Sequence, residues 1–228
     1  IDTIAYMAGV DKVDGILMDI GVSSKQLDDP ERGFSYRYDV KLDMRMNTEQ
    51  KISAYDIVNT YTEEQLSKII FEYGEERHAR KIAKLIVEER KSSPIEKTSD
   101  LITLIKRAYP ERALKHPAKK TFQAIRIEVN RELEVLENAI SKAAELLKVG
   151  GRLAIITFHS LEDRIVKNKF KDLATACKCP KDIPICVCGG VKKFEIITKK
   201  PIIPIDNELK NNNRSHSSKL RILERILD

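Results

Sequence analysis

The stretch VDGILMDIGVSSKQLDD, residues 13–29, decides the fold. Its apolar run ILM at residues 16–18 ends at Asp19 and passes at once into the turn segment GVSS at residues 21–24. A short apolar run bounded by turn residues predicts a strand buried on both faces, as in a parallel sheet. In open α/β sheets the ligand lies outside the carboxyl ends of the strands, so Asp19 is either a ligand-facing carboxylate or a solvated acid.

A second apolar run, RLAIITFHS at residues 152–160, follows a helical pattern and the pair Gly150-Gly151. Helix, double glycine, apolar strand and polar tip are typical of a parallel crossover unit. We therefore expect the glycine pair to end the helix. We also expect His159 to lie on the same edge of the sheet as Asp19.

The remaining α/β elements follow this second strand. LEDRIVKNKF, residues 161–170, predicts a helix. The alternation in KKFEIITKKPIIP, residues 192–204, and SSKLRILERI, residues 217–226, predicts two antiparallel strands that close the sheet.

Between the two apolar runs lies a block of helical patterns. TEEQ at residues 62–65 has the form of a capping box, and residues 75–91 supply a second helix. Ser99 is expected to cap a third helix, which stops at Pro110. Three consecutive helices with no strand between them predict a helical subdomain, residues 53–116, inserted into an α/β domain made of residues 1–52 and 117–228.

Residues 121–148 predict one long amphipathic helix, because apolar side chains recur every three or four positions. This stripe consists of Phe122, Ile125, Val129, Leu133, Leu136, Ile140, Ala143 and Leu147.

Composition sets the broad class of protein. The chain has 228 residues, of which 42% are hydrophobic and 33% charged, and this is typical of a soluble globular protein. No apolar run approaches the roughly 20 residues of a membrane helix, so we expect no membrane partner and a cytoplasmic location. A net charge of +6 favours an anionic partner, most often a nucleic acid. Oligomeric state cannot be read from the sequence.

Basic and aromatic residues suggest an RNA surface. The long loop at residues 28–47 combines aromatic side chains with arginines, which favours an ordered loop near a site over a disordered one. Lysines and arginines would hold phosphates while aromatic rings stack an unpaired base. For any one of these charges taken alone, ordinary solvent exposure is the more common explanation. The candidates for RNA contact are Arg32, Phe34, Tyr36, Lys119, Lys120, Arg126, Arg214 and Lys219.

All four cysteines fall in CKCPKDIPICVC, residues 177–188. Two Cys-x-Cys pairs can supply the four thiolates of a tetrahedral zinc site, although Cys-x-x-Cys is the usual spacing. The candidate ligands are Cys177, Cys179, Cys186 and Cys188. Structural zinc and reduced thiols without a metal both remain open, and a cytoplasmic location disfavours disulfides.

Five long blocks of this sequence resemble one known family. Together they span nearly the whole chain, so the resemblance is highly specific. They are DGILMDIGVSSKQLDDPERGFSYRYDVKLDMRM, YGEERHARKIAKLIVEER, HPAKKTFQAIRIEVNREL, GGRLAIITFHSLEDRIVK and RSHSSKLRILER. They resemble the bacterial small-subunit (16S) rRNA cytosine-N4 methyltransferases, the RsmH or MraW family.

The resemblance implies an S-adenosylmethionine-dependent enzyme that methylates the exocyclic amine of a cytidine in the decoding region of 16S rRNA in the small ribosomal subunit. It implies a class I, Rossmann-like methyltransferase sheet of order 3-2-1-4-5-7-6, with a helical domain inserted after strand four. Asp19 and Gln26 match the positions that contact S-adenosylmethionine. The cysteine segment resembles one found in only some members, so a role in methyl transfer is not expected.

The chain departs from the family pattern at its start. Residues 1–15, which begin with Ile1, indicate a helix running into strand four, and the glycine-rich loop after strand one is not in this chain. We therefore expect an N-terminally incomplete sheet with a bare edge at strand four. We also expect these 228 residues alone to bind S-adenosylmethionine weakly and to be inactive.

Transfer of a methyl group from a sulfonium to an amine needs aligned reactants, an unstacked base and loss of one amine proton, but no metal. His159 and Ser160 are the candidates for gripping the cytosine or relaying its proton. Alternatively, His159 bonds only to the next helix. Two other functions stay open, namely a catalytically incompetent RNA-binding fragment and a methyltransferase with a different acceptor.

Overall fold

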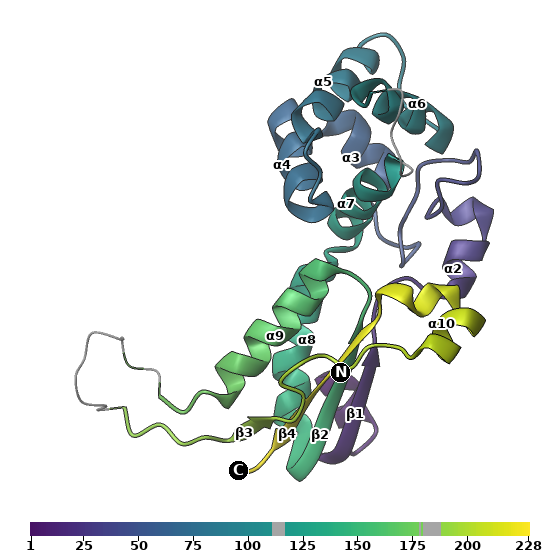
Figure 1. Cartoon of the computed structure of the whole chain (residues 1–228). Helices are drawn as coiled ribbons and strands as arrows, with labels where there is room; N and C mark the ends of the chain where they lie inside the picture. Colours follow the sequence, from purple (N-terminus) through teal and green to yellow (C-terminus); the bar gives the residue numbers. More distant parts are fainter. Residues whose placement is uncertain (111–116, 178, 180–187) are drawn as a thin grey trace. The chain divides into compact units, whose positions relative to one another are not determined.

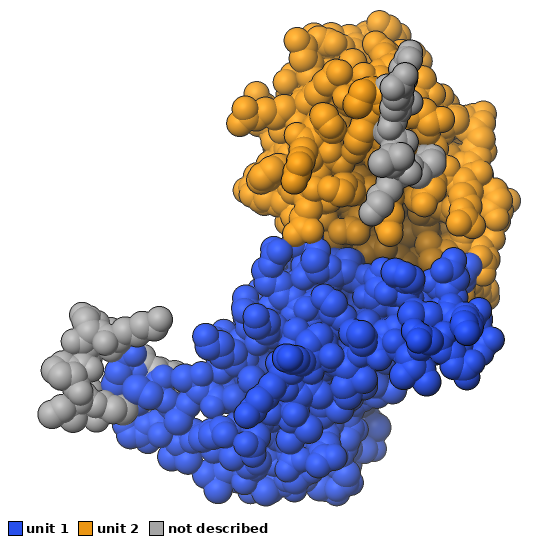
Figure 2. Space-filling model, in the orientation of Figure 1, with its two compact units in different colours: residues 1–21, 133–228 blue, residues 22–132 orange. Residues whose placement is uncertain are grey.

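The computed structural model describes residues 1–110, 117–177, 179 and 188–228. They form two compact units, one made of residues 1–21 and 133–228 and the other of residues 22–132 (Figure 2). Each unit has its own hydrophobic core. The helical unit is therefore larger than the predicted residues 53–116. The loop before these residues and the helix after them bury Phe34, Met44 and Phe122 in the same core as the predicted helices.

The first unit contains a four-stranded sheet in the order β1-β2-β4-β3 (Figure 1). Its strands are β1 (Val13–Asp19), β2 (Leu147–Thr157), β3 (Phe194–Ile196) and β4 (Lys219–Arg225). β1 and β2 are parallel, whereas β4 is antiparallel to both β2 and β3. This confirms the parallel crossover and the antiparallel closing pair. It is also the order in which strands 4, 5, 7 and 6 of the class I sheet follow one another.

Two helices, α8 (Glu132–Leu146) and α9 (Ser160–Ala174), supply the apolar cover of this sheet. Leu136 and Ile140 of α8 and Phe170 of α9 share a core with Leu153 and Ile155 of β2. The other helical elements of the unit are short, namely α1 (Asp2–Met7), α10 (Asp206–Asn211) and the 3-10 helix η2 (Asn213–Ser217).

The prediction that the first apolar run is buried on both faces was wrong. No residue of β1 is fully buried, and Leu17 is 67% exposed. Ile16 and Met18 pack on the core from one face of the strand, while Leu17 points to the opposite face, as the alternation of a strand requires. Within the described residues, β1 pairs only with β2, so it forms an edge of the sheet.

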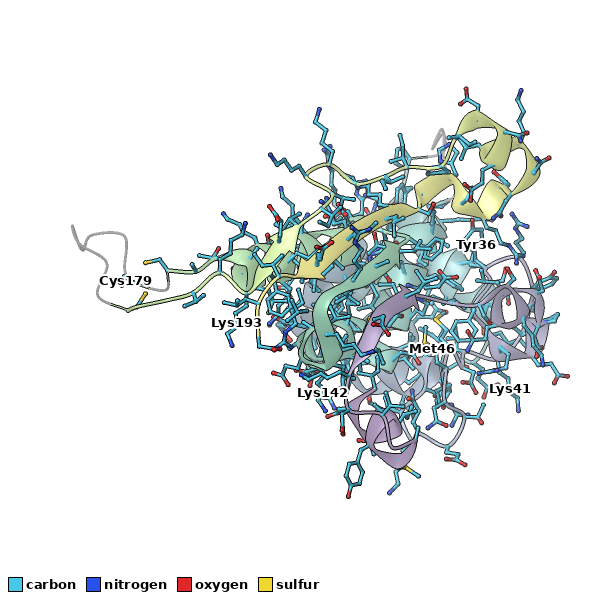
Figure 3. The ribbon with its side chains drawn as sticks, turned by 90° about the horizontal axis from the view of Figure 1, so that it is seen from below. Tyr36, Lys41, Met46, Lys142, Cys179 and Lys193 are labelled. Atoms are coloured by element: carbon cyan, nitrogen blue, oxygen red, sulfur yellow. The ribbon has the colours of Figure 1, made fainter. Side chains whose placement is uncertain are left out.

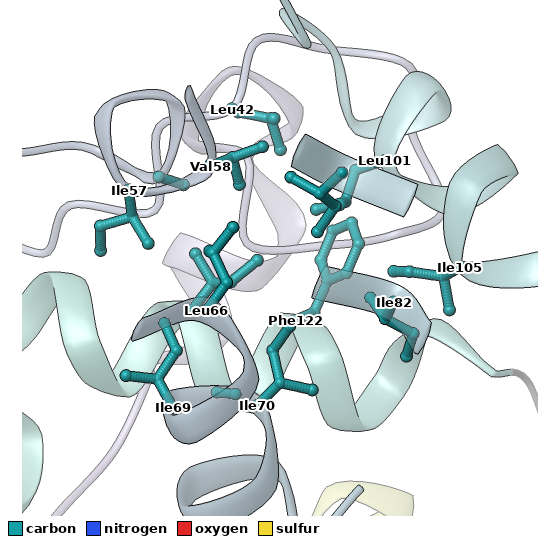
Figure 4. Packing of buried hydrophobic residues seen from close by; sticks show 14 of the residues in the cluster. Leu42, Ile57, Val58, Leu66, Ile69, Ile70, Ile82, Leu101, Ile105 and Phe122 are labelled. Carbon is teal, nitrogen blue, oxygen red and sulfur yellow. The ribbon is translucent and has the colours of Figure 1, made fainter. Parts of the chain in front are cut away.

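The second unit is helical. It contains α2 (Ser24–Asp28), the 3-10 helix η1 (Pro30–Arg32), α3 (Ala54–Thr60), α4 (Glu63–Gly74), α5 (Ala79–Glu89), α6 (Thr98–Ala108) and α7 (Ala118–Asn130). Figure 4 shows Leu66, Ile70, Ile82 and Phe122 packed in its core.

Two helix starts in this unit were predicted from the sequence. The capping box of α4 is confirmed, since the side chains of Thr62 and Gln65 each bond the other's backbone N–H. Ser99 does not cap α6, because the helix already begins at Thr98. Its hydroxyl instead lies 2.6 Å from Asp39 Oδ1.

The long helix predicted at residues 121–148 is two helices. α7 ends at Asn130, Arg131 adopts the left-handed conformation with φ 49°, and α8 begins at Glu132. The apolar stripe is continuous in sequence, but its first half enters the core of the helical unit and its second half enters the core of the sheet unit. Periodicity therefore identified the buried positions except Leu133, which is half-buried and in neither core, without revealing that they belong to two cores or that Leu147 is the first residue of β2.

Gly150 and Gly151 lie inside β2 and do not end a helix, because α8 already stops at Leu146. A Cβ atom at Gly151 would lie 3.1 Å from the Val13 carbonyl oxygen and 3.2 Å from that of Asp14. The Lys148 carbonyl oxygen of β2 itself would lie nearer still, at 2.9 Å, so glycine is needed at this position because the backbones of β2 and β1 both pass close.

None of the helices in the described ranges combines the length and the apolar character needed to cross a membrane.

Candidate functional site at the carboxyl ends of β1 and β2

The polar tips of β1 and β2 lie at the same end of the sheet, as predicted. Asp19 is the last residue of β1 and stands in register with Ile156 of β2, and His159 follows two residues after the end of β2. The Ile20 N–H donates to the Ile156 carbonyl at 3.3 Å, so the two chains stay paired up to the point where they diverge.

Gly21 turns the chain away from β1 with φ +96°. A Cβ atom there would lie 3.6 Å from the Phe158 ring and 3.9 Å from a carboxylate oxygen of Glu162. The turn after β1 therefore packs against the residues that surround His159. Asp19 itself is exposed, and its carboxylate makes no hydrogen bond or ion pair within the described part of the chain.

His159 is the N-cap residue of α9, and Glu162 completes a capping box with it. His159 Nδ1 accepts a 3.4 Å hydrogen bond from the Glu162 N–H. Glu162 Oε2 accepts from the backbone N–H groups of Phe158 at 2.8 Å and His159 at 3.2 Å. These bonds satisfy N–H groups that the start of a helix otherwise leaves without a partner.

The second ring nitrogen of His159 has a different environment. Nε2 is buried and lies 3.2 Å from Glu162 Oε1, but it makes no hydrogen bond of acceptable geometry in the described structure. Because Nδ1 accepts a hydrogen bond, the proton of the neutral imidazole belongs on Nε2. His159 therefore bonds to the next helix through one nitrogen and keeps an N–H donor on the other.

An ion-pair network fixes the start of α9 to the sheet. Arg221 of β4 donates from Nε to Asp163 Oδ1 at 2.6 Å, and Lys219 Nζ lies 3.3 Å from Oδ2. Burial raises the pKa of the Asp163 carboxyl, but the hydrogen bonds and charges of Arg221 and Lys219 outweigh it and hold the pKa below its ordinary value. Asp163 thus anchors the helix that carries His159.

Gln26, the second residue matched to cofactor binding, lies in the helical unit. Its side-chain oxygen accepts from the Ser23 N–H at 3.0 Å, and its own N–H donates to Ser23 Oγ at 3.2 Å. This reciprocal pair is the capping box of α2, which the sequence analysis did not identify.

The aromatic loop is ordered, but its predicted RNA contacts are mostly used in packing. Phe34 is only 6% exposed, and its burial leaves no ring face for stacking on a base, so this part of the prediction is not supported. Tyr36 contacts Phe122 edge to face, with ring centroids 5.9 Å apart. Arg32 donates to the carbonyl oxygens of Arg45 and Met46 at 2.6 and 3.1 Å, which makes it a loop-fixing residue.

Two neighbouring loop residues are exposed in place of those three, namely Arg37 and Tyr38. Tyr38 is 42% exposed. Their side chains are therefore more accessible to an RNA than those of Arg32, Phe34 and Tyr36, the loop residues selected from the sequence. Nothing in the sequence distinguishes these two residues from their neighbours, because aromatic and basic residues are interspersed along the whole loop.

The other RNA candidates differ in how much of their charge is balanced. Arg126 forms a two-point ion pair with Glu132, at 2.8 and 2.9 Å, which neutralises it. Lys219 is paired with Asp163 as described above, and Lys120 donates to the Glu75 carbonyl at 2.6 Å. Lys119 and Arg214 are exposed.

Three of the cysteines converge on the arm between α9 and β3, well out from the sheet, where Figure 3 labels Cys179. The Sγ atoms of Cys177, Cys179 and Cys188 all lie within 4.8 Å of one another, and the Cys188 and Cys177 sulfurs are 3.8 Å apart. Cys186, the fourth predicted ligand, lies outside the described residues.

A model of the MraW methylase family matches residues 1–226 of this chain. The chain belongs to that family. Among its relatives are proteins named ribosomal RNA small subunit methyltransferase H, including those of three species. The protein from Fusobacterium nucleatum is 96% identical over 228 residues, covering 100% of this chain and 73% of its own length.

The other two relatives are more distant. Identity is 56% with the protein of Clostridium botulinum strain Kyoto and 57% with that of Clostridioides difficile. These matches cover 99% and 96% of this chain and 74% and 71% of the relatives. Membership of the MraW family agrees with the α/β sheet and with the polar rim at the ends of β1 and β2.

Proposed function

We propose that the protein that carries this chain is an S-adenosylmethionine-dependent methyltransferase of small-subunit rRNA, and that it modifies the N4 amine of a cytidine in the decoding region of 16S rRNA. Two facts support this function, namely membership of the MraW methylase family and the names of its relatives. The observation that carries the proposal is structural. A carboxylate and an imidazole stand at the shared carboxyl end of two parallel strands, which is where this class of sheet binds its ligands.

The residues at this rim fit S-adenosylmethionine. When bound, it supplies a methyl group carried on a sulfonium. Asp19 offers an exposed carboxylate with both oxygens available within the described structure, which suits the amino and hydroxyl groups of such a ligand. Gly21 has no side chain, and its turn keeps the backbone close to Phe158. Gln26 is proposed as a second contact on the strength of the family motif.

His159 is proposed to hold the cytosine. Its Nε2 carries the proton of the neutral ring, because Nδ1 accepts from Glu162. The imidazole therefore acts as a hydrogen-bond donor to the base, and it does not take the amine proton. Of the two roles predicted for this residue, gripping the base is the one that needs only an N–H donor, and it requires the ring to turn outward, because Nε2 is buried beside Glu162 Oε1 in this structure. Ser160 follows it as the first residue of α9 and is proposed as a neighbouring contact.

The test is methyl transfer from tritiated S-adenosylmethionine to purified small ribosomal subunits, with the natural protein that carries this chain. The expected product is N4-methylcytidine in the rRNA, and Asp19→Ala is expected to raise the KM for S-adenosylmethionine about tenfold, equivalent to roughly 1.4 kcal/mol. Lys25→Ala, a change at an exposed residue of α2, is the control. Label on free nucleoside or protein, with none on rRNA, would contradict the proposal.

A catalytically incompetent RNA-binding protein is the second candidate. The basic residues favour it, since Lys119 and Arg214 are exposed. Such a protein would bind rRNA in a salt-dependent way, would transfer no label, and would not be protected against thermal unfolding by S-adenosylmethionine.

We further infer that the cysteine cluster binds a structural zinc ion. Zn–S bonds of about 2.3 Å in a tetrahedron place the sulfurs about 3.8 Å apart. Cys188 and Cys177 show this separation, 3.8 Å, whereas a disulfide requires about 2.05 Å. Cys179 lies within the same 4.8 Å cluster. A zinc ion held by four thiolates has no open coordination position. Its role would therefore be structural, holding the segment that follows α9 against the segment that precedes β3.

Metal analysis of the purified protein tests this inference. We expect about one zinc per chain, lost in Cys177→Ser and Cys188→Ser, with methyl transfer retained. A protein purified with excess zinc that holds no zinc after desalting would contradict the inference. Cobalt substitution gives a second readout, because a tetrahedral thiolate site produces an intense visible spectrum.

A further inference from the structure

A basic groove lies between the second half of α9 and the strands β3 and β4 of the sheet. We propose that this groove is a second RNA site, which holds phosphates of the rRNA outside the reacting nucleotide. This proposal depends on the proposed function in one respect, namely that the molecule bound in the groove is rRNA. It is independent of the roles of Asp19 and His159, because the lysines on which it rests, Lys167, Lys171 and Lys199, contact neither residue.

The groove has a volume of about 450 Å³ and lies wholly within the sheet unit. Its lining comes from the second half of α9, from the segment around β3 and from β4, elements that pack against each other (Figure 1). Phe170 and Ile196 supply apolar surface, and the basic side chains are Lys167, Lys171, Lys192, Lys199 and Arg221. Glu195 is the one acid among the lining residues.

Some of these charges are already balanced inside the protein. Lys192 pairs with Glu195 at 3.5 Å, and Arg221 pairs with Asp163 at 2.6 Å. The other three lysines, Lys167, Lys171 and Lys199, are exposed and make no ion pair with any described residue. The groove therefore presents three uncompensated positive charges around an apolar floor.

The fold by itself does not account for these three charges. The negative end of the α9 dipole favours a cation in the last turn, which explains Lys171. It does not explain Lys199, which comes from a separate segment beyond β3 and reaches the same groove. Converging lysines from two elements suit phosphate groups, and the apolar floor suits a ribose or the edge of a base.

The groove is separate from the rim. Lys171 lies eleven residues along α9 from Ser160, a helical rise of about 17 Å. A single bound nucleotide cannot span this distance, so an RNA that reaches the groove from the rim must extend over several nucleotides. Rigid α9 would fix the spacing between the two contacts.

The experiment compares two charge-reversal pairs in the natural protein that carries this chain. Lys171→Glu with Lys199→Glu changes the groove. Lys142→Glu with Lys148→Glu is the control, because these lysines are 51% exposed in the same unit and make only surface ion pairs, with Asp2 and Asp14 (Lys142 is labelled in Figure 3). Circular dichroism melting confirms that both variants fold.

Binding to naked small-subunit rRNA is measured from 50 to 200 mM salt. We expect the groove variant to bind at least tenfold more weakly at 100 mM salt and to lose about one unit of the logarithmic salt slope per lysine. The salt slope of the control variant is expected to fall by no more than half of the fall seen in the groove variant. The affinity for S-adenosylmethionine is expected to be unchanged in both variants.

Two results would overturn the proposal. One is an unchanged slope in the groove variant while the wild type binds and methylates rRNA, a result that leaves the proposed function intact. The other is weaker binding to whole small subunits with unchanged binding to naked rRNA, which would indicate an acidic protein segment as the occupant. Failure of the wild type itself to bind or methylate rRNA would instead refute the proposed function.

Discussion

His159 uses its two ring nitrogens for different purposes. Nδ1 caps α9 by accepting from the Glu162 N–H, while Nε2 keeps an N–H without a hydrogen bond in the described structure. A residue with a capping role and a substrate role loses both when it is changed to alanine. The two roles are separable only with a substitution that preserves the cap.

Asparagine at this position makes that separation. Asn is among the best N-cap residues, so His159→Asn is expected to keep the free energy of unfolding within about 1 kcal/mol of wild type. Loss of the Nε2 donor is expected to slow single-turnover methylation of small subunits about a hundredfold. His159→Ala should show the same rate loss and an additional cost of about 1 kcal/mol in stability. A wild-type rate in His159→Asn would remove His159 from the site.

Asp163 connects stability to pH. Its pKa is lowered in the folded chain, so its ion pair contributes stability that is present above the unfolded pKa of about 3.9 and lost as the pH falls through the lower folded pKa. Asp163→Asn leaves Arg221 without its partner and is expected to cost about 3 kcal/mol at pH 7.

Urea unfolding at pH 7 and pH 3 measures this effect. The difference between wild type and Asp163→Asn should shrink at pH 3, where the wild-type carboxyl approaches protonation. Asp172→Asn, an exposed acid on the same helix, is the control and should change stability by less than about 0.5 kcal/mol. Equal destabilisation at both pH values would show that the ion pair is not responsible.

Among the elements, the break between α7 and α8 is set by a side chain at its end. Asn130 donates to the Met44 and Arg126 carbonyl oxygens, both at 2.8 Å, and accepts from the Met46 N–H at 2.7 Å. Met44 itself has φ 60°, a conformation that costs energy for a residue with a Cβ atom. The helix end and the loop 86 residues before it therefore stabilise each other.

Asn130→Asp tests this link with almost no change in shape. A carboxylate cannot donate, so the bonds to the Met44 and Arg126 carbonyls are lost while the acceptor toward Met46 is kept. The expected cost is about 1–3 kcal/mol, with faster hydrogen exchange at the Met46 amide. Asn138→Asp, an exposed site on α8, is the control and should have little effect. Unchanged exchange at Met46 would contradict the proposed role of Asn130.

At the scale of the whole molecule, each unit buries its own apolar residues, and β1 has a single neighbouring strand among the described residues. β1 pairs only with β2 within the described residues, and Leu17 is 67% exposed on it. An unpaired strand with an exposed apolar side chain tends to pair with another chain.

We therefore expect the 228-residue chain to self-associate at high protein concentration, and Leu17→Lys to reduce this association. Light scattering over a concentration series measures the mass. Ile203→Lys is the control, because Ile203 is 64% exposed but lies outside the strands. Equal association in wild type and Leu17→Lys would show that the β1 edge is not the contact.

Local patterns in the sequence determined the elements and the position of the rim. The apolar runs, the capping box at residues 62–65 and the turn after Asp19 predicted strands, a helix start and a polar edge that the structure confirms. These features depend on residues a few positions apart, so the signal is contained in the sequence itself. The family blocks added the reaction and the cofactor, which local patterns alone do not specify.

Tertiary contacts decided the rest. Whether Phe34 stacks on a base or fills a core, and whether residues 121–148 form one helix or two, depends on partners far away in the sequence. The same holds for the groove, where Lys171 and Lys199 meet only because α9 packs beside β3. Periodicity shows that a side chain is buried, but only the packed chain shows which core buries it and which charges are left without a partner.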